Sequence, residues 1–218
     1  MPHMNSHGQT IAVIDFETTG MGPHMGARAT EIAVVLVRDG AIVDQYQNLM
    51  YTGVWVPPFI EQLTGISNEM LRTAPPAETV MREVAAFTAG VPLVAHNASF
   101  DRTFWHAEMA RAGMPADPAH EFACTVLLSR RLYPDAPDHK LGTLARHHHL
   151  PRDGRAHRAM SDAMVTAHLL LRMQQDLGER HPDLPAHTHR SHSLLCALQR
   201  TPKHQLQRCI ERLCQAEA

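Results

Sequence analysis

The chain has 218 residues, 44% of them hydrophobic and 19% charged, which is enough apolar material for one domain with a buried core. Its formal net charge of −2 argues against a protein that coats nucleic acid through bulk positive charge. No apolar run approaches the ~18 residues that suggest a membrane helix, and the first ten residues do not resemble a signal peptide. We therefore expect a cytoplasmic protein that does not contact a membrane.

The cysteines do not form a disulfide framework. No two of them are spaced as a CxxC pair, and three lie late in the chain. We expect free thiols, with a structural zinc site as the less favoured alternative. The four residues are Cys124, Cys196, Cys209 and Cys214.

The chain opens with strand patterns. Branched apolar residues at 10–17 predict a first strand, which Thr18-Thr19-Gly20 ends. Two further β-rich segments, 31–38 and 41–51, flank Asp39-Gly40, which is a strong hairpin signal. We expect these three strands to form an antiparallel meander.

Helical patterns then alternate with a short apolar strand at 91–95. We expect helices at 57–63, 75–89, 99–112 and 158–177, and segments that are helical or partly so at 122–132 and 141–148. A meander followed by alternating strands and helices predicts an α/β domain with a mixed sheet. We place this domain at 10–178, after a flexible N-terminus at 1–9.

The remaining segment, 179–218, begins as a polar linker and continues as a helical C-terminal extension. Its last helix, expected at 202–216, carries apolar residues at helical spacing on one face. This face either packs back on the domain or docks a partner or a second subunit, and the sequence leaves both possibilities open.

Three motifs carry groups suited to catalysis. Asp15 and Glu17 share one face of the first strand, because alternate residues of a strand point the same way. Two neighbouring carboxylates repel each other, so they take up a proton or hold a cation unless water solvates them at the strand end.

The remaining two motifs place single polar residues near predicted helix starts. Asp101 follows the strand at 91–95 and falls in the first turns of a helix, where it could simply favour the helix dipole. His157 precedes Asp162 by five residues, which suits a loop histidine before a helix. Taken alone, His157 is one of 17 histidines and has an ordinary surface or core interpretation.

A basic cluster surrounds the third motif. The segment 130–158 holds seven Lys or Arg residues and three Asp residues. Such a cluster is either a solvated face or a rim that faces phosphate groups, and its position beside His157 favours the rim.

Together, in this order and spacing, Asp15, Glu17, Asp101, His157 and Asp162 resemble the three exonuclease motifs of the DnaQ-like DEDDh 3′–5′ exonucleases. The resemblance covers about residues 10–175, and Leu63-Thr64-Gly65-Ile66 resembles a short segment that this family carries between its first two motifs. Residues 179–218 lie outside the resemblance.

The resemblance implies a ribonuclease-H-like fold, with a five-stranded mixed sheet whose fifth strand is weakly signalled at 121–123. It also implies hydrolysis at a nucleic-acid 3′ end with two metal ions. Asp15 would bridge the ions, Glu17 and Asp162 would complete one site, and Asp101 would hold the second ion. Clustered carboxylates favour Mg²⁺ or Mn²⁺ over zinc, and His157 would act as general base.

By the same resemblance, Thr18 and Thr64 would lie near the terminal nucleotide, and Phe100 would pack against a base or sugar. The expected partner is a single-stranded 3′ end, with DNA only slightly favoured over RNA. A homodimer or a polymerase bound through the C-terminal helix, as for a proofreading subunit, stays open. The same fold could also serve a non-catalytic nucleic-acid-binding module, and the same metal site could serve an enzyme that hydrolyses a small phosphodiester.

Overall fold

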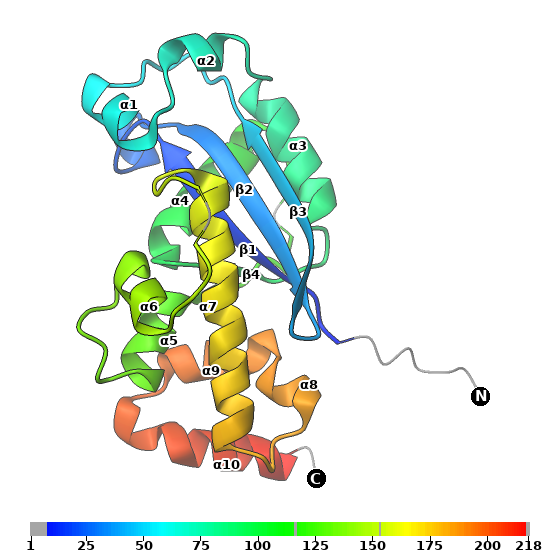
Figure 1. The fold of residues 1–218 in the computed structure, drawn as a ribbon. Helices are drawn as coiled ribbons and strands as arrows, with labels where there is room; N and C mark the ends of the chain where they lie inside the picture. The colour runs from blue at the N-terminus through cyan, green and yellow to red at the C-terminus, as the bar shows by residue number, and fades with distance from the viewer. Residues whose placement is uncertain (1–7, 116, 153, 217–218) are drawn as a thin grey trace.

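The structure, a computed structural model, describes residues 8–115, 117–152 and 154–216. Most of the expected flexible N-terminus at 1–9 therefore lies outside the described residues. Figure 1 shows a sheet between helices, with a group of short helices at the C-terminal end. The strands are β1 (Ile11–Thr18), β2 (Ala29–Arg38), β3 (Ala41–Leu49), β4 (Leu93–Ala95) and β5 (Phe122–Cys124).

The helices surround this sheet. They are α1 (Pro58–Thr64), α2 (Asn68–Arg72), α3 (Ala77–Phe87), α4 (Ala98–Arg111), α5 (Thr125–Leu132), α6 (Leu141–His147), α7 (Ala159–Arg180), α8 (Ala186–His189), α9 (His192–Arg200) and α10 (Leu206–Ala216), with short 3₁₀ turns at Pro23–Met25 and Lys203–Gln205. Among the described residues, each helix is too short or too polar to cross a bilayer.

The sheet is mixed, as expected, and its strand order is β3-β2-β1-β4-β5. The antiparallel pairs β1–β2 and β2–β3 form the predicted meander, and β4 and β5 add parallel strands beside β1. Asp39 and Gly40 have φ angles of 53° and 82°, the left-handed pair that a tight two-residue hairpin turn requires. The predicted hairpin is therefore present.

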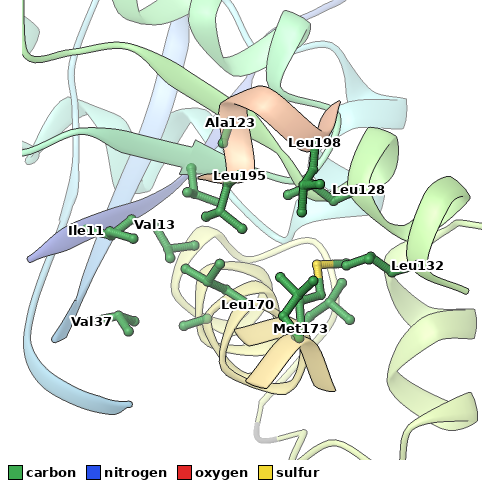
Figure 2. Packing of buried hydrophobic residues seen from close by; sticks show 14 of the residues in the cluster. Ile11, Val13, Val37, Ala123, Leu128, Leu132, Leu170, Met173, Leu195 and Leu198 are labelled. Atoms are coloured by element: carbon green, nitrogen blue, oxygen red, sulfur yellow. The ribbon is translucent and has the colours of Figure 1, made fainter. Parts of the chain in front are cut away.

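Alternation along the strands gives the sheet two apolar faces. Ile11 and Val13 point to the face covered by α7, while Ala12 and Ile14 point to the face covered by α3 and α4. In Figure 2, Leu170 and Met173 of α7 lie among the side chains of β1 and of the neighbouring helices. Strands β1 and β2 are thus buried on both faces, whereas the edge strand β3 is largely exposed, and this burial fixes the register of the inner strands.

The C-terminal helices share this core. Leu194, Leu195 and Leu198 of α9 are buried in the same cluster as Ile11 and Val13 of β1. Cys209 and Ile210 of α10 are buried there too, with Leu206 and Leu213 packed against the cluster. The amphipathic face of the last helix therefore packs back on the domain.

Some local predictions differ from the structure. The segment 122–132, expected to be helical or partly so, begins with strand β5 before α5 starts at Thr125, and β5 lies within one residue of the fifth strand expected at 121–123. The expected last helix at 202–216 is divided, because Lys203–Gln205 forms a 3₁₀ turn before α10. Helix α2, which was not expected, begins after Ser67, whose hydroxyl accepts a hydrogen bond from the amide of Met70 at 3.1 Å.

Candidate active site

The site begins where the C-terminal end of β1 extends past β4. β4 pairs with β1 only as far as Val13 and ends at Ala95, so the last residues of β1 have a free edge on that side. Asp15 and Glu17 occupy this free end and point to the α7 face, as their alternation with Ile11 and Val13 requires. The short length of β4 therefore opens space beside two carboxylates.

Asp101 fills part of this space from α4. It lies in the first turn of that helix and is only 2% exposed. Its Oδ1 accepts a hydrogen bond from the backbone amide of Phe16 at 3.1 Å. The Asp101 carboxylate thus satisfies an amide that no longer has a strand partner on that edge, and this amide lies between Asp15 and Glu17 in the chain.

The third motif approaches from α7. Asp162 lies in the first turn of this helix, and its Oδ2 accepts a hydrogen bond from the backbone amide of His157 at 3.1 Å. His157 has a φ of 62°, a left-handed conformation that non-glycine residues rarely adopt. Ligand atoms of Glu17, His157 and Asp162 all lie within 4.8 Å of one another. The structure therefore brings together the five residues of the three motifs.

The clustered carboxyl groups share an environment that disfavours negative charge. Burial, with Asp101 and Glu17 nearby, raises the pKa of Asp15 well above its usual value. Burial and the charge of Asp162 raise the pKa of Glu17 to about 8, and burial raises the pKa of Asp101 to about 7. Burial also raises the pKa of Asp162. Burial therefore disfavours negative charge on these carboxyl groups, and a cation bound among them would offset that cost.

A fifth carboxylate, Glu31, supports this arrangement and was missed by sequence reasoning. It lies on β2 opposite Glu17 and is completely buried. It accepts hydrogen bonds from Arg158 at 2.7 and 3.1 Å, from the amide of Ala159 at 2.9 Å and from Gln47 at 2.7 Å. These bonds outweigh burial and lower the pKa of Glu31, so it remains charged. A signal existed, because Glu31 alternates with the apolar residues Ala33 and Val35 and so had to face the core.

A cleft of about 750 Å³ adjoins the site on the side of α5 and α6. His157 and Asp162 form part of its wall, and three members of the basic cluster line it: Arg130, Lys140 and Arg152. Some members turn elsewhere. Arg155, for example, donates to the carbonyl of Gln62 at 2.8 Å. The basic cluster therefore divides into a part that faces the cleft and a part that does not.

The three residues expected near substrate have local partners. The Thr18 hydroxyl donates to the carbonyl of Gly20 at 2.7 Å, and the buried Thr64 hydroxyl donates to the carbonyl of Ile60 at 3.0 Å. Phe100 is half-buried, with its ring centroid 5.0 Å from that of Phe104. These contacts are those of turn, helix-end and core residues, and the roles of the three residues toward substrate stay predictions.

Comparison with known proteins identifies the domain. Residues 12–170, which contain all five motif residues, match the family described as RNase_T exonuclease. The chain belongs to the RNase_T exonuclease family. The expected resemblance to DnaQ-like DEDDh 3′–5′ exonucleases is confirmed at the level of this domain.

Relatives of the RNase_T domain occur in larger proteins. The 3′–5′ exonuclease DinG of Bacillus subtilis (strain 168) is 39% identical over 171 residues, which cover 78% of this chain and 18% of that protein. The PolC-type DNA polymerase III of Halalkalibacterium halodurans is 36% identical over 170 residues, 78% of this chain and 12% of that protein. The chain thus spans less than a fifth of these curated relatives.

Solved structures share the fold. Exonuclease X in complex with 5′ overhanging duplex DNA is 30% identical, with a TM-score of 0.60 over 78% of this chain and 92% of that one. The nuclease domain of 3′hExo, a DEDDh family member bound to rAMP, is 22% identical, with a TM-score of 0.67 over 78% of this chain and 94% of that one. The expected ribonuclease-H-like architecture of the RNase_T domain is therefore confirmed.

Proposed function

We propose that this chain hydrolyses the terminal phosphodiester bond at the 3′ end of a nucleic acid, releasing nucleotides in the 3′ to 5′ direction. The observation that carries the proposal is the convergence of four carboxylates from three elements beside His157. A module that only binds nucleic acid gains nothing from this arrangement, because carboxylates repel phosphate groups unless cations lie between them.

The residues present fit divalent cations. Asp15, Glu17, Asp101 and Asp162 offer oxygen ligands, and burial raises the pKa of Glu17 and of Asp101, so a bound cation would offset the cost of their negative charge. Hard oxygen ligands favour Mg²⁺ or Mn²⁺, in keeping with the general metal dependence of the family. We assign Asp15, Glu17 and Asp162 to one ion, and Asp15 and Asp101 to a second. The bound ions would stabilise the charge that develops on the attacking and leaving oxygens.

His157 is proposed as the general base. It is exposed and lies close to Glu17 and Asp162, where a water molecule attacking phosphorus would be held. The imidazole takes a proton from that water, the new oxygen–phosphorus bond forms, and the bond from phosphorus to the 3′ oxygen of the preceding nucleotide breaks. The products are a nucleoside 5′-monophosphate and a chain shortened by one unit.

The cleft beside His157 supports a strand-end substrate. Arg130, Lys140 and Arg152 place positive charge along its wall, which suits the phosphates of the nucleotides that precede the 3′ end. Exonuclease X was solved with 5′ overhanging duplex DNA, and on that likeness we favour DNA over RNA. The 3′ end of such a duplex is recessed, so the unpaired 3′ end expected from the sequence is a separate part of the proposal. Thr18, Thr64 and Phe100 are proposed to border the terminal nucleotide.

A role beside a polymerase is a second candidate, since PolC-type DNA polymerase III is among the relatives. The C-terminal helix gives it little support, because Cys209 and Ile210 of α10 are buried in the domain's own core. We therefore favour an enzyme that acts without a partner at this helix.

The test is degradation of 5′-labelled oligonucleotides. Single-stranded DNA, single-stranded RNA and duplexes with 3′ or 5′ overhangs would be incubated with Mg²⁺, Mn²⁺ or EDTA, beside the variant Asp15→Asn. We expect a ladder that shortens from the 3′ end, requires a divalent ion and disappears in the variant.

Three different outcomes would contradict this expectation. Binding without cleavage in both metals would contradict the exonuclease proposal and favour a binding module. Cleavage of dinucleotides but of neither polymer would point to a small phosphodiester substrate. Shortening from the 5′ end would contradict the assigned direction.

A further inference from the structure

We propose that Glu121, His192 and Cys196 form a second metal site, separate from the carboxylate cluster and suited to Zn²⁺. We call this group the α9 site. His192 and Cys196 come from α9, and Glu121 immediately precedes β5. Ligand atoms of the three residues lie within 4.8 Å of one another. The site adjoins Leu93, which pairs with Ala12 of β1, whereas the candidate active site begins at Asp15.

The spacing of the two helical ligands matches zinc coordination. His192 and Cys196 are four residues apart and therefore share one face of α9, and each is only 3% exposed. Sγ of Cys196 lies 3.6 Å from Nδ1 and 3.8 Å from Nε2 of His192, so it faces the imidazole ring rather than the lone pair of one nitrogen. A tetrahedral zinc ion with Zn–N of about 2.0–2.1 Å and Zn–S of about 2.3 Å separates its nitrogen and sulfur ligands by roughly 3.6 Å. Because Sγ lies off the lone-pair direction of Nδ1, an ion would bind both atoms only after the Cys196 side chain turns about its Cα–Cβ bond, with the backbone of α9 in place.

The orientation of His192 is already set for metal binding. Its Nε2 lies 2.9 Å from the carbonyl oxygen of Leu93, an atom that can only accept a hydrogen bond. Nε2 therefore carries the proton, and the lone pair lies on Nδ1, 3.6 Å from Cys196 Sγ. A backbone carbonyl on the distal nitrogen is the arrangement that commonly fixes metal-binding histidines.

Leu93, which accepts the hydrogen bond from His192, also holds the backbone of Glu121. The carbonyl oxygen of Glu121 accepts a hydrogen bond from the amide of Leu93 at 2.9 Å, so Leu93 anchors the backbone of one ligand and the side chain of another. The Glu121 side chain is half exposed, which gives an ion access from solvent and leaves room for a water as fourth ligand. Thiolate, imidazole and carboxylate together favour zinc over Mg²⁺.

Arg200 would compete with the proposed ion for the carboxylate of Glu121. Its guanidinium forms an ion pair with Glu121, but its side chain is 66% exposed and can turn into solvent. Burial and the charge of Glu121 raise the pKa of the Cys196 thiol to about 11, so without an ion the thiol keeps its proton and can donate it to Nδ1 of His192. Zinc would displace this proton and Arg200 together, and would clamp α9 to the sheet.

Cobalt spectroscopy tests the proposal on the full chain. The protein would be stripped with a chelator and titrated with Co²⁺ in excess Mg²⁺, which keeps the carboxylate cluster occupied. A near-ultraviolet band from cobalt–thiolate charge transfer reports only ions bound to cysteine. We expect this band to saturate at one equivalent, to be abolished by Zn²⁺, and to be absent in Cys196→Ser but retained in Cys209→Ser, whose thiol is buried in α10.

Two surface variants keep the test decisive if Cys196→Ser does not fold. Glu121→Gln should weaken Zn²⁺ binding by on the order of tenfold or more, and Arg200→Ala should tighten it. Absence of the band from the wild type, persistence of the band in Cys196→Ser, or identical affinity in wild type and Glu121→Gln would overturn the proposal and leave a thiol–imidazole hydrogen bond.

Discussion

The carboxylate of Glu31 on β2 and the guanidinium of Arg158 are joined by hydrogen bonds of 2.7 and 3.1 Å, and Arg158 directly follows His157. The same carboxylate accepts the amide of Ala159, the first residue of α7. The start of α7 is thereby attached to β2, the strand on which Glu31 pairs with Glu17 of β1. His157 is held in its left-handed conformation between this anchor and its own hydrogen bond to Asp162.

This anchor predicts a positioning effect. Glu31→Gln should lower kcat for oligonucleotide hydrolysis with little change in KM, because the His157 loop loosens while the substrate cleft remains. The free energy of unfolding should fall by about 1–3 kcal/mol, since Arg158 loses its charged acceptor. Steady-state kinetics and urea unfolding measure both effects, with Glu83→Gln on the exposed surface as control. A loss of stability with unchanged kcat would show that Glu31 is structural only.

Replacement of the proposed base should reduce catalysis and leave metal binding. His157→Asn is the suitable change, because asparagine tolerates the left-handed backbone at this position. We expect kcat to fall by about 10²–10⁴-fold, the usual contribution of general base catalysis. Mg²⁺ affinity, measured by calorimetry, should stay close to that of the wild type. Full activity in His157→Asn would remove this residue from the mechanism.

Removal of one carboxylate should have opposite effects on activity and on the stability of the metal-free protein. Asp15→Asn relieves repulsion from Asp101 and Glu17, so it should raise the melting temperature in EDTA at pH 8. Mg²⁺ should raise the melting temperature of the wild type more than that of the variant, which should also lack exonuclease activity. Equal stabilisation of both proteins by Mg²⁺ would place the cation elsewhere.

The raised pKa of Glu17 predicts a pH dependence of stability in EDTA. Burial and nearby carboxylates raise this pKa from 4.5 to about 8 in the folded state. The folded state therefore binds the proton more tightly than the unfolded chain, and the resulting stability is complete below about pH 4.5 and lost as pH rises toward 8. Relative to Glu17→Gln, the wild type should become progressively less stable over this range in urea unfolding. A constant difference between the two would contradict the shift.

The basic wall of the cleft should contribute to the salt dependence of binding. Each residue that contacts a phosphate contributes about 0.7 to the slope of log K against log salt for single strands. Arg130→Gln and Arg152→Gln should each reduce this slope for single-stranded DNA bound in Ca²⁺, and should raise KM. Arg146→Gln is the matched control, because Arg146 donates to Thr143 and does not line the cleft. If all three variants reduced the slope equally, the salt dependence would come from the overall positive charge of this surface and not from contacts of Arg130 and Arg152 with phosphates.

Sequence reasoning succeeded where local chemistry decides the structure. The alternation at Asp15 and Glu17 predicted their shared face, and Asp39-Gly40 predicted the hairpin. It failed where only tertiary contacts decide. Phe122–Cys124 is three residues long and fully buried, so its apolar run has no period that separates strand from helix. The pattern left this segment helical or partly so, and only the family resemblance indicated the strand, at 121–123.

Contacts between residues far apart in the sequence could not be predicted, because they too depend on tertiary structure. Glu31 and Arg158 are 127 residues apart in the chain, and each alone is an ordinary charged residue. The partners of α9 are equally remote, because the amide of Cys124 donates to Gln199 across 75 residues. Such pairs become visible only when the sheet order is known.

The shared core also sets the smallest unit that can fold. The family match ends at 170, inside α7, yet the core cluster that contains Ile11 and Val13 of β1 also contains leucines of α9 that lie more than twenty residues later. A protein shortened to the matched residues would keep the first half of α7 over β1, but it would lose the apolar residues of α7, α9 and α10 that complete this cluster and would expose the rest of the cluster to water. We expect such a fragment to aggregate, so the segment after residue 170 belongs to the folded domain in a physical sense, although it lies outside the sequence signature of the family.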